Sequence, residues 1–138
     1  MQTINYTTFE AMDLNIYNEI SGATATSAVV KGAGEVIQNR FCFHLMGKTA
    51  AQIADGDTDL TPIYKMRQVN ARKRTGTGET FAGGDNVYYY PSDSRVSSTA
   101  TGTAGSDYYY CGTCKKPAAA SDLVVLMEFD GTRYTEDI

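Results

Sequence analysis

Hydrophobic and polar residues alternate along much of this chain in short runs, which are bounded by Gly, Pro, Asn, Asp or Ser. The clearest run covers residues 40–46, where Phe41, Phe43 and Leu45 alternate with Cys42 and His44. A period of two places successive side chains on opposite faces of a strand. Both faces of this strand are therefore expected to be largely apolar.

Similar runs predict further strands along the chain, separated by turn residues such as the Gly-Gly-Asp at 83–85 and Pro91. In the longest run, Ile63 and Val69 share one parity and Met66 has the other, which predicts that Met66 faces away from them. Short strands with closely spaced turns predict a mostly β fold, a small antiparallel β-barrel or sandwich. The predicted strands cover residues 34–37, 61–74, 88–90, 95–99, 108–114 and 123–129.

The beginning of the chain has a different pattern. Phe9, Met12 and Ile16 recur at helical spacing, and a Thr-x-x-Glu capping box begins at Thr7. These features predict a short amphipathic helix near residues 8–20, and an extended arm is the alternative.

A run of small polar residues at 21–28 is typical of a linker. We therefore divide the chain into an N-terminal arm and linker, residues 1–28, and a β-barrel-like domain, residues 29–138. The apolar stripe of the arm is expected to dock either on its own domain or on another subunit.

Charge is distributed unevenly over the 138 residues, whose formal net charge is −4. Residues 61–78 carry five basic and no acidic side chains, whereas the segments before and after them are acidic. The chain shows no basic stretch followed by an apolar run at its start, and its three cysteines are an odd number. These features favour a protein that has no signal peptide, stays in a reducing cytoplasm and has no membrane partner.

One cysteine pair has the spacing of half a zinc site. Cys111 and Cys114 form a C-x2-C motif, and Cys42 with His44 are candidates for the other half. Residues three apart on a strand point to opposite faces, so the two thiols converge only if the chain kinks between them. We expect buried free thiols and no metal.

Other signatures of chemistry are incomplete. His44 is the only histidine, and no Gly-x-Ser-x-Gly elbow accompanies it. The acidic run at 55–59 begins like a calcium loop but has Leu60 where Gly is required and Met66 where Glu is required. We therefore expect no enzymatic activity and no cofactor.

The basic strip and the nearby tyrosines permit two interpretations. They are compatible with a stacking surface for single-stranded nucleic acid on a barrel, or with a charged edge that complements an acidic protein surface. The acidic remainder of the chain would repel phosphate, so nucleic acid is not the expected partner.

Two triple tyrosines mark predicted strands. Alternation sends the outer two rings of each triplet to one face and the middle ring to the other. Few small barrels bury aromatic rings on both sides, so some of the six are expected at a subunit interface. They are Tyr88, Tyr89, Tyr90, Tyr108, Tyr109 and Tyr110.

The order of these features resembles a known family. Residues 78–90 read GETFAGGDNVYYY, with Gly78, Gly84 and Asp85 in the motif, and a strand through Gly112 then leads by an Ala/Asp turn to the run LVVLMEF at 123–129. This pattern resembles the capsid decoration, or cement, proteins of tailed bacteriophages, a family long catalogued as a domain of unknown function. The likeness covers roughly residues 35–130, by pattern and without a catalytic signature.

The resemblance implies a non-enzymatic, β-barrel-like virion protein. Such a protein is made in the host cytoplasm, binds as a homotrimer to the outer surface of the phage head and clamps neighbouring major capsid subunits. A tail or spike module and a single-stranded nucleic-acid-binding barrel are the alternatives. The residues expected to contact the capsid are Tyr6, Phe9, Met12, Ile16, Arg72, Lys73 and Arg74, and the six tyrosines are expected at the subunit interface.

Overall fold

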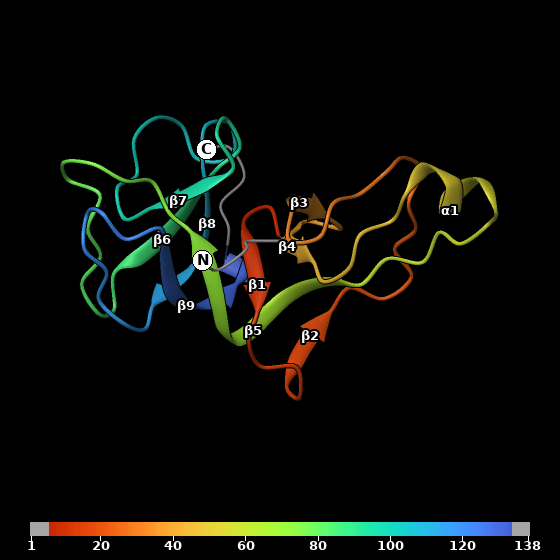
Figure 1. Cartoon of the computed structure of the whole chain (residues 1–138), viewed down its shortest axis with the longest axis horizontal. Coiled ribbons are helices and arrows are strands. Elements are labelled where there is room, and N and C mark those ends of the chain that lie inside the picture. Colours follow the sequence, from red (N-terminus) through yellow and green to blue (C-terminus); the bar gives the residue numbers. More distant parts are fainter. Residues whose placement is uncertain (1–5, 134–138) are drawn as a thin grey trace.

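The computed structural model describes residues 6–133 and has a mostly β architecture, as predicted. All named strand pairs are antiparallel, and they form one sheet that curls into a half-barrel (Figure 1). Seven strands follow the order β3-β4-β5-β9-β8-β6-β7, and β1 and β2 also pair with β5. The elements are β1 (Phe9–Ala11), β2 (Tyr17–Glu19), β3 (Gly34–Ile37), β4 (Arg40–His44), α1 (Ala50–Ala54), β5 (Pro62–Arg72), β6 (Asn86–Tyr90), β7 (Arg95–Ser97), β8 (Tyr109–Cys114), β9 (Val124–Asp130) and the short 3-10 helix η1 (Gly131–Arg133).

Strand β5 lies at the centre of the sheet and has neighbours along both edges. Met66 pairs with Tyr17 of β2 and with Phe129 of β9, while Ile63 pairs with β2 and with β4, and Val69 pairs with β1 and with β9. Because a strand residue has one neighbour on each side, β4 and β9 share one edge of β5, and β2 and β1 share the other. This long strand therefore organises the fold.

The helix predicted near residues 8–20 is wrong. β1 and β2 run in the same direction along β5, so they are two parts of one edge strand interrupted by residues 12–16. The backbone N–H groups of Met12 and Ile20 donate to β5 carbonyls at 3.0 and 2.9 Å. A helix of this length is marginal in water, and pairing with β5 satisfies the backbone instead.

The N-terminal segment contributes directly to the hydrophobic core. Phe9 is 1% exposed, and its ring centroid lies 5.1 to 6.0 Å from those of Phe41, Phe43, Tyr89 and Phe129. Within the apolar stripe, Phe9 docks on the chain's own domain, whereas Met12 and Ile16 are exposed. Phe9 joins rings from strands β4, β6 and β9.

A β-bulge corrects the predicted parity of β5. The register with β9 shifts between Met66 and Val69, so that Arg67 and Gln68 together oppose one residue of β9. The extra residue there places Met66 on the same side as Val69, and a second register shift, between the pairs Asn18–Lys65 and Glu19–Ile63, brings Ile63 to that side as well. All three side chains are buried. Arg67 and Gln68 are exposed.

Glycines in two segments, the turn before β6 and strand β8, have clear structural roles. In the turn before β6, the Asp85 carboxylate accepts a hydrogen bond from the Ala82 N–H at 2.8 Å, and Gly84 has a φ of 88°. In β8, Gly112 has a φ of 146°, and a Cβ there would lie 1.9 Å from the Glu128 carbonyl oxygen. Only glycine suits that position.

A projection extends from the sheet and has α1 near its end (Figure 1). Thr49 and Gln52 exchange hydrogen bonds in a capping box at the start of α1. No residue of α1 is buried. Isolated bridges from Thr24 to Asp59 and from Val29 to Lys48 hold the projection together.

Candidate functional site

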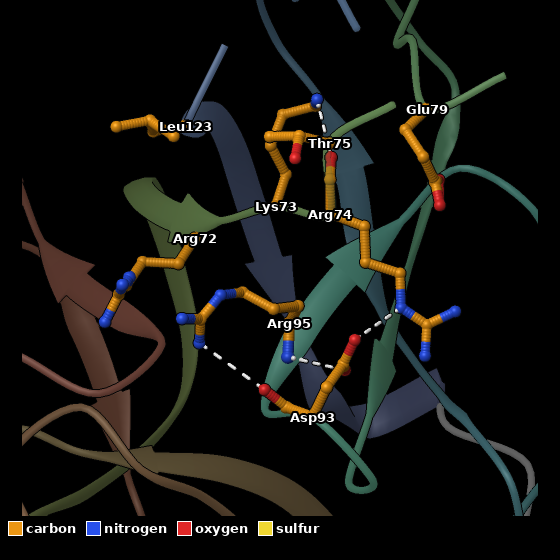
Figure 2. A pocket seen from close by; sticks show the side chains of 8 residues that line it. All are labelled: Arg72, Lys73, Arg74, Thr75, Glu79, Asp93, Arg95 and Leu123. Carbon is orange, nitrogen blue, oxygen red and sulfur yellow. Dashed lines mark hydrogen bonds and ion pairs between the residues drawn. The ribbon is translucent and has the colours of Figure 1, made fainter. Parts of the chain in front are cut away.

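A cationic basin lies where β5 ends beside the start of β7 (Figure 2). Its cavity has a volume of about 570 Å³. Four basic and two acidic side chains line it, so its formal charge is +2. The lining residues are Arg72, Lys73, Arg74, Thr75, Glu79, Asp93, Arg95 and Leu123.

Arg74 is held in place by two contacts. Its guanidinium carbon lies 3.8 Å from the centroid of the Tyr90 ring, and its Nε donates to the Asp93 carboxylate at 2.8 Å. The Tyr90 hydroxyl in turn donates to the carbonyl oxygen of Thr99. Stacking and a charge-assisted hydrogen bond fix the guanidinium as part of the basin wall.

Lys73 is oriented differently from its neighbours, because its side chain is buried. Its Nζ donates to the carbonyl oxygens of Arg74, Ala119, Ala120 and Asp122, at 2.8 to 3.4 Å. Three N–H donors serve four acceptors, so at least one bond is shared. The ammonium group therefore tethers residues 119–122 to the end of β5.

Burial also affects the titration of Lys73. Desolvation lowers its pKa, and the carboxylates of Glu79 and Asp122 partly oppose that shift. A charge surrounded by backbone carbonyls has little left to offer a partner. The expected role of Lys73 as a contact residue is thus less suited to its position than a structural role.

Arg72 and Arg95 have binding capacity left. Arg72 donates to the Thr7 carbonyl oxygen, and Arg95 donates to those of Asp93 and Ser94. Within residues 6–133, no carboxylate lies within ion-pair distance of either guanidinium group. Each group can form paired hydrogen bonds with an incoming carboxylate.

Sequence reasoning identified the stretch 72–74 but missed Arg95 and Asp93. Both come from the turn and strand that follow β6, about twenty residues further on. The Lys73 to Val96 bridge places β7 beside the end of β5. No local pattern announces this pairing, because it depends on the curl of the whole sheet.

The expected capsid-contact residues of the N-terminal segment fall into two groups. Tyr6 and Phe9 are buried, at 9% and 1% exposure. Met12 and Ile16 are 49% and 55% exposed and belong to the loop between β1 and β2. Leu14, which sequence reasoning did not single out, is 62% exposed in the same loop. We call residues 12–16 the apolar loop.

The predicted parity of the tyrosine triplets is confirmed. Tyr89 packs against Phe9 and Phe41, and Tyr109 stacks on Phe41 at 5.4 Å. The outer rings of the triplets pack against one another on the other face, with centroids 5.3 to 6.2 Å apart. Tyr90 is itself buried, at 5% exposure, whereas the other three outer rings are partly exposed. We call Tyr88, Tyr108 and Tyr110 the tyrosine face.

The cysteines are three buried free thiols. The Sγ of Cys111 donates to the Val87 carbonyl oxygen, and that of Cys114 donates to the Lys116 carbonyl oxygen. Burial raises the pKa of all three, and for Cys42 burial together with the nearby Glu35 raises it to about 12. Among the described residues, no group of three or more potential ligands could hold a metal ion.

His44 is 1% exposed and lies with its Nε2 2.6 Å from a carboxylate oxygen of Glu35. Its Nδ1 has no hydrogen-bond partner in the part of the chain that the structure covers. Cys42 donates to the Glu35 carbonyl oxygen across the same strand pair. The arrangement fastens the edge strand β3 to β4.

Comparison with protein families, curated proteins and solved structures finds no match for this chain. In residues 6–133, no helix is long and apolar enough to cross a membrane. The chemistry of the basin and the exposed surfaces therefore carries the functional argument.

Proposed function

We propose that this protein is a structural component of a tailed-phage virion, which binds the outer surface of the head and stabilises it by clamping neighbouring major capsid subunits. The observation that carries the proposal is the basin, where the guanidinium groups of Arg72 and Arg95 have no carboxylate partner within residues 6–133. Such a site suits carboxylates on another protein chain. The family resemblance of residues 78–90 and 112–126 supplies the biological setting.

The apolar loop supports the same proposal. Met12, Leu14 and Ile16 are each about half exposed or more, and Tyr17 beside them is 37% exposed. Apolar side chains gathered on one short loop are typical of protein contacts. We assign shell binding to this loop, and the tyrosine face to contacts between the subunits of a homotrimer.

Clamping of this kind requires only modest affinity per copy. A trimer that contacts several capsomers at once turns later contacts into intramolecular ones, so its overall binding exceeds that of each contact. Binding to the assembled shell but not to its dissociated state stabilises the shell by mass action.

Counting copies in purified virions tests this function. Quantitative mass spectrometry of separated heads and tails is expected to find hundreds of copies on heads. A few copies on tails would favour the tail or spike alternative, and absence from virions would refute the proposal.

A reattachment assay tests the apolar loop. Heads stripped of the protein are incubated with wild-type protein or with a variant carrying Met12→Ser and Ile16→Ser. We expect at least a tenfold loss of binding for the variant. Val30→Ser is the matched control, since Val30 is 62% exposed outside the loop. Equal binding by all three proteins would show that the loop does not contact the shell.

A second function, binding of single-stranded nucleic acid, is favoured by one observation. Arg74 stacks on Tyr90 at the wall of a cationic cavity, a combination that also suits bases and phosphates. It predicts binding to an oligothymidine probe at low salt, with a steep loss as salt rises. No anisotropy change at low salt would remove this alternative.

A further inference from the structure

The tip of the projection carries an acidic cluster that is the counterpart of the basin. Asp55, Asp57 and Asp59 are exposed in the loop that follows α1. Lys48 forms an ion pair with Asp57 at 2.5 Å, which leaves the tip with a formal charge of −2. The carboxylates of Asp55 and Asp59 have no ion-pair or hydrogen-bond partner among the described residues.

The basin has the matching number of unsatisfied groups. Arg72 and Arg95 lack a carboxylate partner, whereas Arg74 already binds Asp93 and Lys73 is buried. The two unpaired carboxylates of the tip match in number the two guanidinium groups of the basin that lack a carboxylate partner, and the formal charges of −2 and +2 are equal and opposite. Figure 2 shows both guanidinium groups on the same side of the view, away from the Lys73 ammonium.

A chain cannot satisfy its own basin in this way. In Figure 1 the projection with α1 extends away from the part of the sheet that contains β6 and β7, where the basin lies. The tip and the basin belong to different ends of the molecule. A contact between them therefore needs two copies.

We propose that the acidic tip of one copy, through Asp55 and Asp59, inserts into the basin of a second copy and binds Arg72 and Arg95. This inference deepens the proposed function, because it identifies a source for the carboxylates that the basin binds. Tip into basin is a heterologous contact, which closes into a ring if the rotation between copies permits. The apolar loop then stays available to the shell.

The construction of the tip supports a second copy as the occupant. No residue of α1 is buried, so the helix and its acidic loop add little to the core of their own chain. The aspartate side chains of the tip are short, and a cavity of about 570 Å³ can accept the loop that carries them. Paired hydrogen bonds between carboxylate and guanidinium also select the geometry of the contact.

Charge exchange provides a sharp test by sedimentation velocity at low salt. The tip variant carries Asp55→Lys and Asp59→Lys, and the basin variant carries Arg72→Glu and Arg95→Glu. We expect wild-type protein to self-associate, and each variant alone to associate at least tenfold more weakly. An equimolar mixture of the two variants should regain association, because each tip then meets a basin of opposite charge.

Two controls match the change in charge without touching the contact. Glu19→Lys with Glu128→Lys corresponds to the tip variant, and Lys115→Glu with Lys116→Glu corresponds to the basin variant; all four residues are exposed. Both controls should associate like wild type. If the basin variant does not fold, the tip variant decides the matter alone, because α1 buries nothing.

A monomeric wild type at about 100 µM and low salt, association unchanged in the tip variant, or no recovery in a mixture of folded variants would each overturn the proposal. Raising the ionic strength should weaken the wild-type contact, because exposed charges are screened. These results do not depend on the count of copies in virions. Failure of this inference is therefore distinguishable from failure of the proposed function.

Discussion

Replacing Phe9 by Ala tests whether the N-terminal segment belongs to the folded core. Phe9 is 1% exposed and contacts four other rings, two from β4 and one each from β6 and β9. Removing a fully buried phenylalanine ring typically costs about 3–5 kcal/mol, from lost burial and the cavity that remains. We expect the free energy of unfolding to fall by that amount.

A loss of this size is easily measured, because small domains are stable by only about 5–15 kcal/mol. Urea unfolding followed by circular dichroism gives the difference directly, and the slope with denaturant should stay unchanged. Ile16→Ala is the matched control. Ile16 is 55% exposed, and its substitution should change stability by no more than about 0.5 kcal/mol.

The result that refutes the reasoning is a small effect of Phe9→Ala. A loss below about 1 kcal/mol, close to that of the Ile16 control, would mean that β1 is a detachable arm whose aromatic ring adds little to the core. The close packing of Phe9 against rings of β4, β6 and β9 would then be contradicted.

Three further substitutions or treatments test the remaining structural claims. Lys73→Met should lower the free energy of unfolding by about 2–4 kcal/mol, since backbone carbonyls lose their donor, and the exposed Lys65→Met should not. The pKa of Lys73 is lowered in the folded state, so between that pKa and the ordinary value of 10.5 the unfolded state binds more protons than the folded state. As the pH rises through this window, the free energy of unfolding of the wild type should therefore increase relative to that of Lys73→Met. Gly112→Ala should lower the free energy of unfolding by about 3 kcal/mol or more, because the added Cβ meets a backbone carbonyl. Gly83→Ala should be nearly neutral, because the space around Gly83 is open, and equal melting temperatures of the two variants would contradict this. At pH 8 the buried thiol of Cys42, whose pKa is raised to about 12, should resist alkylation until urea is added, and rapid labelling of folded protein would show the burial to be wrong.

Much of the sheet could be predicted from local pattern. The strands at 34–37, 40–44 and 124–130 lie where alternation or an apolar run placed them. These signals are local because side-chain spacing acts within a few residues.

The errors arose where distant partners decide the structure. Residues 8–20 have helical spacing, but β5 provides a sheet edge that satisfies their backbone, and sequence spacing cannot report that edge. Met66 faces the core because a bulge inserts one residue before Val69. A bulge of this kind leaves no clear mark in a polar stretch such as Arg67 and Gln68.

The candidate site could be predicted only in part, because contacts between distant strands bring some of its residues together. The basic run 72–74 is visible in the sequence, but its three side chains have different roles: Lys73 is buried, Arg74 is paired with Asp93, and Arg72 retains free donors. Arg95 joins them only because β7 lies beside the end of β5. Parity correctly divided the tyrosine triplets, since alternation holds along each short strand.

The most direct test of the proposed function is an electron cryo-microscopy reconstruction of heads with and without this protein. We predict additional density on the outer surface, repeated with the symmetry of the shell and bridging neighbouring capsomers, into which the half-barrel fits with its apolar loop toward the shell. Identical outer surfaces in the two reconstructions, with the protein present in the sample, would contradict the proposal.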